Sequence, residues 1–235
     1  MEISDFVYAF TRWLHLVAGV TWIGLLYYLN FVQGPFMASA EGPVKSAIVR
    51  GLLPRALWWF RWGAALTWLT GIVLLMLFAH KLGLTFFETK RGVVITLASF
   101  IATLMAYNVW FVIWPAQQVV IASAEAVAAG GQANPEALAR GARAACASRH
   151  NVFFSIPMFL MMMTSAMLPL PGSTLLAAKT LMVIYGAVGA LYLAFEVNAL
   201  VGKTGPLTTV KGVITAGFAM AGVLYGVIFG VLKLL

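Results

Sequence analysis

Residues suited to redox chemistry gather around one histidine near the start of this 235-residue chain. His15 lies inside a long apolar stretch, and helical spacing puts Arg12, Gly19 and Trp22 on the same face. Gly19 would leave space for a flat macrocycle, and Arg12 could meet a carboxylate. These residues therefore predict a non-covalent b-type haem with His15 as the iron ligand. A histidine that only packs and hydrogen-bonds is the alternative.

The other two histidines lie at the ends of apolar segments. His80 closes the second segment on the same side as His15 and is followed by Lys81, so it is a second candidate haem residue. A solvated histidine at the membrane surface is the alternative for it. His150 opens the fourth segment on the opposite side. It is therefore not expected to share an iron with His15.

A second group of polar side chains lies toward the segment ends opposite His15. Asn108, Arg149, His150 and Asn151 belong to this group, and tryptophans recur at the same ends. Amides, an arginine and a histidine beside aromatic rings can stack on and hydrogen-bond a small planar anion rich in nitrogen. We therefore expect these four residues to bind substrate. Interfacial anchoring and helix capping enrich the same residue types, and that alternative stays open.

Glu196 is an acidic residue inside the fifth apolar segment. Ionisable groups in a membrane are costly and usually have a partner or a function. Glu196 could form an ion pair with Arg61 or Arg149, or it could act as a proton relay. Both interpretations place it with the polar residues opposite His15.

Two repeated patterns are attributed to packing. The methionines at 161–163 are interpreted as gap-filling core residues. Gly222, Gly226 and Gly230 recur at four-residue spacing, which allows a neighbouring helix to approach closely. Packing within the bundle is favoured for this stripe, and a homo-oligomer interface is the alternative.

The composition places all these residues in a membrane protein. Hydrophobic residues make up 62% of the chain and charged residues 9%, which excludes an ordinary soluble domain. About 20 apolar residues are needed for each helical crossing, and only helices satisfy their own backbone groups in lipid. An all-α transmembrane bundle of about six helices, forming one domain over 1–235, is therefore predicted. The apolar segments lie at 8–32, 56–79, 92–114, 150–169, 175–200 and 210–232.

Charge and cysteine content limit which partners and which kinds of cofactor attachment are expected for this chain. The net charge is +8, but the basic residues lie in the connections between apolar segments, so membrane lipid rather than nucleic acid is expected as the partner. One side receives a modest excess of Lys and Arg, which predicts both termini on the periplasmic side of a bacterial inner membrane. The single cysteine, Cys146, excludes an internal disulfide and the C-x-x-C-H attachment of c-type haem.

Four blocks of sequence carry a family resemblance. They lie at 15–31, 53–63, 108–117 and 148–157, and they occur in this order along the chain. They resemble the membrane domain of bacterial membrane-bound urate hydroxylases, the urate oxidase N-terminal family. The resemblance implies an inner-membrane protein that oxidises urate to 5-hydroxyisourate as a dehydrogenase. It also implies electron transfer to a cytochrome c domain fused at the C-terminus.

The chain departs from that family pattern in two places. It ends at Leu235 without a C-x-x-C-H motif, so the cytochrome c acceptor is expected to be a separate protein. Thr164, Ser165 and Ala166 stand where some relatives are expected to carry a histidine. The His-x-x-x-Gly pattern of the first segment is also similar to other small haem-associated membrane families.

Three functions stay open at this point, and a structural bundle that binds no ligand is a further alternative. The first is a urate-hydroxylase-like oxidoreductase that takes its substrate from the cytoplasm and passes electrons outward to a separate cytochrome c. The second is a non-catalytic electron-transfer subunit with b-type haem, and the third is an organic-anion transporter. The polar group and His15 are expected to be separated by half a bilayer, or about 15 Å. Direct oxidation at an iron on His15 would require a shorter separation.

Overall fold

The structure is a computed structural model that describes residues 3–167 and 175–234. Helices dominate these residues, with one isolated β-bridge between Thr89 and Leu175. The elements are α1 (Ile3–Tyr27), η1 (Tyr28–Gln33), α2 (Gly34–Ser39), α3 (Gly42–Ala47), η2 (Ile48–Leu52), α4 (Leu53–Leu82), η3 (Leu84–Glu88), α5 (Lys90–Tyr107), η4 (Asn108–Ile113), α6 (Trp114–Ala128), α7 (Ala137–Met167), α8 (Ala178–Val201), η5 (Gly205–Thr208) and α9 (Val210–Leu234).

Six helical stretches of the described residues are long and apolar enough to cross a membrane. They confirm the prediction of an all-α bundle with six spans. The spans are Asp5–Ser39, Gly42–Leu82, Lys90–Ala128, Ala137–Met167, Ala178–Val201 and Val210–Ile228.

The first four spans are longer than the predicted apolar segments, and the first and third continue past a proline. The predicted segments 8–32 and 92–114 end before Pro35 and Pro115, and these two predicted ends are wrong. The first span continues to Ser39 and the third to Ala128. At a rise of about 1.5 Å per residue, both exceed the roughly 30 Å hydrocarbon core. Their ends therefore project beyond the membrane.

The helices continue because a π-helical turn precedes each of three prolines. Proline has no backbone N–H and collides with the helical turn before it, so a regular ladder would break there. In η1, η2 and η4 the residue before the proline instead donates to the carbonyl five positions back. The widened turn absorbs the extra residue and keeps the helix continuous. The bonds run from Gly34 to Leu29, from Leu53 to Ile48 and from Trp114 to Val109.

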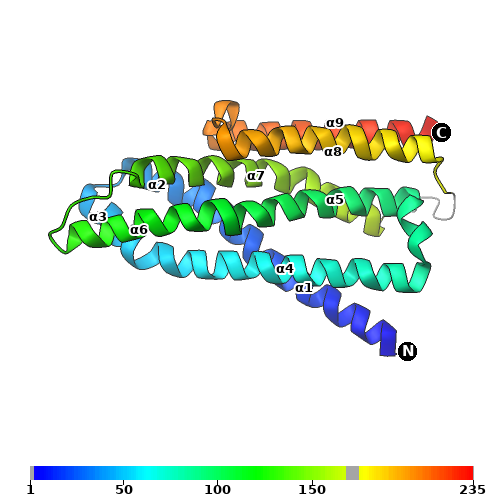
Figure 1. Ribbon diagram of the computed structural model, residues 1–235, viewed down its shortest axis with the longest axis horizontal. Coiled ribbons are helices and arrows are strands. Elements are labelled where there is room, and N and C mark those ends of the chain that lie inside the picture. The colour runs from blue at the N-terminus through cyan, green and yellow to red at the C-terminus, as the bar shows by residue number, and fades with distance from the viewer. Residues whose placement is uncertain (1–2, 168–174, 235) are drawn as a thin grey trace.

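The third and fourth spans form the centre of the bundle. More than half of the residues in their apolar windows are buried, against less than a third in each of the other four spans. Helix α7 packs against α5, α6 and α9, while α1 packs mainly against α4. Figure 1 shows α5, α6 and α7 in the middle, with α4 and α1 on one side and α8 and α9 on the other.

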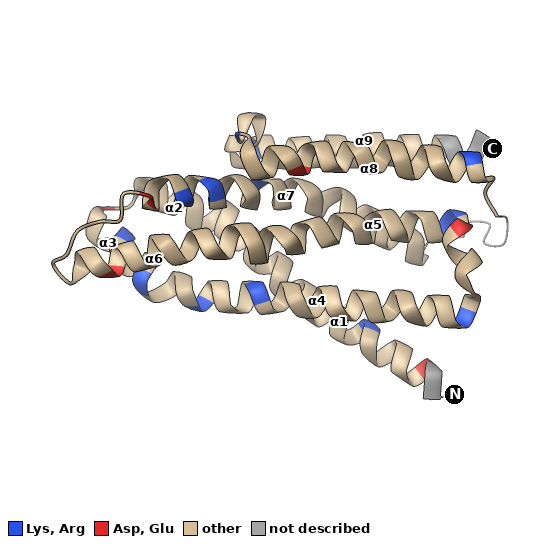
Figure 2. Ribbon diagram, viewed as in Figure 1, with Lys and Arg blue, Asp and Glu red and all other residues tan. Residues whose placement is uncertain are grey.

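Both ends of the described chain lie at the same end of the bundle (Figure 1). The opposite end carries α2, α3 and the connection between α6 and α7. Lys and Arg residues lie mainly toward that opposite end (Figure 2). The distribution agrees with the predicted excess of basic residues on the side away from the termini.

A glycine allows α1 and α4 to approach closely. A Cβ on Gly63 of α4 would lie 3.1 Å from the backbone nitrogen of Trp22 and 3.4 Å from the carbonyl oxygen of Ala18. Small residues at such crossings let helix backbones meet in lipid. The contact holds α4 beside the half of α1 that carries His15.

Candidate functional site

His15 is half-buried between α1 and α4 and is held by a threonine. Its Nδ1 lies 3.1 Å from Thr70 Oγ1, and that hydroxyl donates its own proton to the Leu66 carbonyl at 2.6 Å. Because the hydroxyl proton is already used, Nδ1–H is the donor to Thr70. The Nε2 lone pair is then left for another partner. A metal-binding histidine is commonly oriented in this way by its second nitrogen.

The surroundings of His15 are tight on the α4 side. A Cβ on Gly71 would lie 3.2 Å from His15 Cε1, and a Cβ on Gly19 would lie 3.8 Å from the Thr67 methyl group. Trp22 is buried, and its indole nitrogen has no hydrogen-bond partner among the described residues. The space predicted beside Gly19 is thus bounded by Thr67.

The other two residues proposed to hold haem, Arg12 of α1 and His80 of α4, lie toward the end of these helices that carries the chain termini. Arg12 is exposed and donates to the Tyr8 hydroxyl at 3.5 Å. His80 is exposed and lies ten residues after Thr70 on the same helix, which is about 15 Å along the axis. The structure therefore does not bring His80 beside His15. Of these residues, only His15 offers a nitrogen, Nε2, that could bind a haem iron. Arg12 lies about one turn away on the same helix.

Asn108, Asn151 and Glu196 form a buried polar cluster, which joins η4, α7 and α8. Asn108 Nδ2 donates to Asn151 Oδ1 and to Glu196 Oε2, both at 3.0 Å, and Asn151 Nδ2 donates to the Met105 carbonyl at 3.0 Å. The three side chains are 0%, 0% and 4% exposed. Asn108 Oδ1 and Glu196 Oε1 have no hydrogen-bond partner among the described residues.

Glu196 does not pair with Arg61 in this arrangement. The Arg61 guanidinium stacks on the Trp114 ring, 3.7 Å from its centroid, and the Arg61 carbonyl accepts from Trp110 Nε1 at 3.1 Å. Glu196 is instead held by the Asn108 amide. Its second oxygen is buried and has no partner among the described residues, so it is left for exchange of a proton or contact with a ligand.

His150 is fully buried, and both of its ring nitrogens are engaged. Nδ1 lies 2.9 Å from the Cys146 carbonyl and so carries the proton, while Nε2 accepts from Asn198 Nδ2 at 2.7 Å. Arg143 of α7 adds two further contacts, because its guanidinium donates to the carbonyl oxygens of Ala199 and Gly202. These contacts attach the last turn of α8 to α7 and leave neither ring nitrogen for a ligand.

Arg149, the residue before His150, has a side-chain nitrogen without a hydrogen-bond partner among the described residues. Its Nη1 is buried and makes no hydrogen bond within the described part of the chain. The Asn30 amide donates to Ser148 Oγ at 2.7 Å, so η1 contacts α7 at the residue before Arg149. Gln33, at the end of η1, also has a buried oxygen without a partner. Gln33 was not among the four residues predicted to bind substrate.

The π-helical turns are the signal that could have identified Gln33. Such turns are rare and occur frequently at functional sites. Asn30 and Gln33 lie in η1, and Asn108 begins η4. In both cases a proline follows the turn by one residue, at Pro35 and Pro115.

Fold and site together define the class: a polytopic helical membrane protein with uncompensated polar groups in its interior. The model of the family described as urate oxidase N-terminal matches residues 76–224, which is more than half of the chain. The protein therefore belongs to the urate oxidase N-terminal family, as its sequence blocks indicated. No curated protein and no solved structure matches the chain.

The matched range contains the buried polar cluster and Arg149 but not His15. It begins in α4, at residue 76, and ends in α9. Arg12, Gly19 and Arg61 also precede it. Family membership therefore rests on the half of the molecule where Asn108, Asn151 and Glu196 meet.

Proposed function

We propose that this protein is an inner-membrane oxidoreductase of the urate-hydroxylase type, which converts urate to 5-hydroxyisourate and passes electrons to a separate cytochrome c. The observation that carries the proposal is a set of three buried atoms in the family-matched region that have no hydrogen-bond partner among the residues the structure describes: Asn108 Oδ1, Glu196 Oε1 and Arg149 Nη1. Urate is planar and anionic, with ring N–H donors and carbonyl acceptors. The two oxygens would accept from ring N–H groups, and the guanidinium would donate to an anionic oxygen.

The reaction requires a base as well as a binding site. Urate and water give 5-hydroxyisourate, two protons and two electrons. Glu196 Oε1 is the free oxygen of a buried carboxyl group whose other oxygen is held by Asn108. We assign Glu196 the role of accepting a proton during this step. Asn108 then acts as the positioning residue that orients the carboxyl group.

A b-type haem fits the donor set around His15 of α1. His15 would ligate it through Nε2, Thr70 would hold the imidazole through Nδ1, and Arg12 would pair with a propionate. When bound, the haem would supply a one-electron acceptor within the membrane. The chain itself contributes the ligand, its orientation and a close-packed apolar wall.

Glu196→Gln tests the assigned base. The amide keeps the size of the side chain but cannot take up a proton, so urate turnover is expected to fall by about a hundredfold. Urate consumption would be measured with purified protein and oxidised cytochrome c, together with haem content and thermal stability. Glu125→Gln, at an exposed position of α6, is the matched control. Full turnover by the Glu196→Gln protein would contradict the assignment.

A further inference from the structure

The junction between η1 and α7 holds a buried hydrogen-bond acceptor that the roles assigned above leave unused. Gln33 is the last residue of η1 and is 8% exposed, and its Oε1 has no hydrogen-bond partner among the described residues. The other buried amide of this turn, Asn30, donates to the Leu26 carbonyl at 2.9 Å and to Ser148 Oγ at 2.7 Å. Asn30 therefore attaches η1 to α7, whereas Gln33 keeps an oxygen without a donor.

Burial makes that oxygen costly for the fold. A buried carbonyl oxygen loses its hydrogen bonds to water, and the loss is not offset unless another donor replaces them. A leucine would fill a similar space in the helix without this penalty. The Gln33 amide is therefore expected to have a donor that the described residues do not supply. The flexible side chain of glutamine can turn toward such a donor while η1 stays in place.

A charged donor lies across the same junction. Arg149 follows Ser148 directly in α7, and its Nη1 is buried with no hydrogen-bond partner in the described part of the chain. Gln33 and Arg149 each lie within one helical turn of the bond that joins the two elements. Arginine only donates, and the Gln33 oxygen only accepts. A ligand that satisfies both must therefore carry a donor beside an acceptor.

An N–H group next to a ring oxygen substituent has this arrangement, and it forms the edge of a cyclic amide or urea. Oxopurine rings carry several such edges, and a methyl group on the ring nitrogen removes the donor. A bare cation would be repelled by Arg149, and a carboxylate would offer no donor to Gln33. The junction therefore fits a heterocycle that keeps an N–H beside an oxygen.

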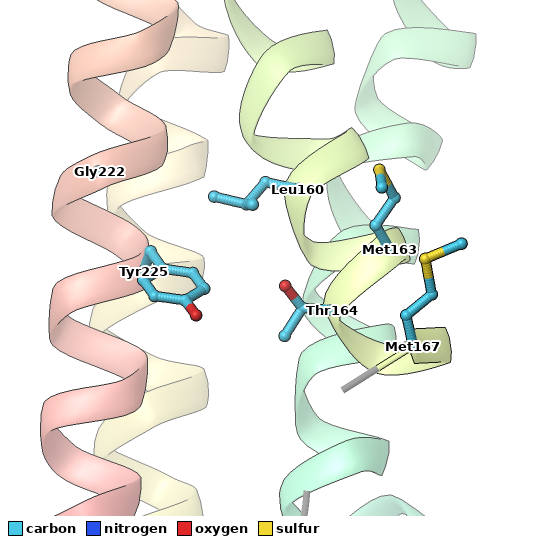
Figure 3. Close-up of a pocket in the computed structure, with 6 residues that line it drawn as sticks. All are labelled: Leu160, Met163, Thr164, Met167, Gly222 and Tyr225. Carbon is cyan, nitrogen blue, oxygen red and sulfur yellow. The ribbon is translucent and has the colours of Figure 1, made fainter. Parts of the chain in front are cut away.

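The pocket between α7 and α9 has a different character. Its lining is mostly apolar, as the Leu160, Met163 and Met167 side chains illustrate in Figure 3. Such a lining gives a planar anion few hydrogen bonds. The buried polar atoms at the η1–α7 junction supply the bonds that this pocket lacks.

We propose that Gln33 is a specificity-determining residue of the substrate site. Its Oε1 accepts from one ring N–H of the substrate, while Arg149 donates to the oxygen beside that N–H. The identity of the substrate as urate rests on the proposed function, whereas the pairing of Gln33 with an N–H–C=O edge rests on the junction itself. Gln33 precedes the family-matched residues 76–224, so the first span would select the substrate that the matched region oxidises.

Binding of urate and its N-methyl derivatives to the detergent-purified full chain tests the proposal. The ligands are urate, 1-methylurate, 3-methylurate, 7-methylurate and 9-methylurate, and affinity is obtained by titration of ligand-induced thermal stabilisation. Methylation of the nitrogen that faces Gln33 is expected to weaken binding to the unmodified protein by about tenfold or more, because a site built around a hydrogen bond rejects a ligand that lacks it.

Gln33→Leu removes the acceptor and leaves an apolar side chain. This variant is expected to bind urate about tenfold more weakly and to bind urate and one of the methylurates equally, so that a single methyl preference disappears. Preferences that arise from Asn108 and Glu196 should persist. Gln118→Leu, at an exposed position of α6, is the matched control and should keep every preference. Thermal stability without ligand should be retained in both variants.

Two results would overturn the proposal. Survival of every methyl preference in Gln33→Leu would show that Gln33 does not contact the ring. An equal loss of affinity for all five ligands would show that Gln33 only supports the fold. A Gln33-dependent preference without urate turnover would support this site and remove the proposed function. Urate turnover with methyl preferences that Gln33→Leu leaves unchanged would do the reverse.

Discussion

The tautomer of His15 depends on a threonine of the neighbouring helix. Thr70 gives its proton to the Leu66 carbonyl and so must accept from His15 Nδ1. His15→Ala is expected to remove haem from a folded protein, and Thr70→Val is expected to weaken haem binding by about tenfold. Haem content would be measured by pyridine extraction. His80→Ala is the control and should retain haem, and loss of haem from that variant alone would contradict the ligand assignment.

Substitution of Arg149, a second single residue, tests the proposed substrate site. Its Nη1 is buried and has no hydrogen-bond partner in the described part of the chain. Arg149→Ala should therefore remove a charge-assisted bond to the anion and raise the KM for urate by about tenfold or more. Arg140→Ala is the matched control, because Arg140 is paired with Glu136 at 3.0 Å on the exposed side of α7. Steady-state kinetics would separate the two variants. An unchanged KM in Arg149→Ala would remove Arg149 from the site.

Side-chain partners could be predicted only in part. Asn108 and Asn151 were expected in one site and do meet, because polar groups in a membrane seek each other. The partners of Glu196 and His150 were not predictable from residue type. Arg61 was an available partner for Glu196, but it stacks on Trp114, and His150 is engaged by a turn of its own helix and by α8. These choices depend on tertiary contacts.

At the scale of elements, the crossing of α1 and α4 depends on Gly63. Gly63→Leu would place a side chain against the backbone of Trp22, so the free energy of unfolding should fall by about 1–3 kcal/mol. Gly24→Leu is the control, since a Cβ there meets nothing within 4 Å. Thermal or denaturant unfolding in detergent would measure both. Equal stability of the two variants would show that the helices are not closely packed at this point.

Helix number was predictable from the sequence, but helix ends were not. Hydropathy reports the apolar length that a membrane requires, and it located all six spans. The predicted segments 8–32 and 92–114 end before Pro35 and Pro115, but a π-helical turn before each proline carries the helix past it. That compensation involves backbone bonds five residues apart, which hydrophobic periodicity does not register. The same turns place Gln33 and Asn108 in the interior.

At the scale of the whole molecule, the charge distribution predicts an orientation. Basic residues gather at the end opposite the termini, so that end should face the cytoplasm. In a Cys146→Ser background, Leu84→Cys should react with an impermeant maleimide in intact cells, because Leu84 is 76% exposed at the end that carries the termini. Gly130→Cys, between α6 and α7, should react only after permeabilisation. The opposite pattern would invert the molecule and place the polar cluster toward the periplasm.

We propose that this protein oxidises urate and binds haem, and a reduced-minus-oxidised absorbance spectrum of the purified protein is the most direct test of both properties. The spectrum would be recorded before and after the addition of urate without any other reductant, and pyridine extraction would identify the haem. The expected result is a b-type spectrum that urate alone reduces. A protein without haem, or with a haem that urate leaves oxidised, would contradict it.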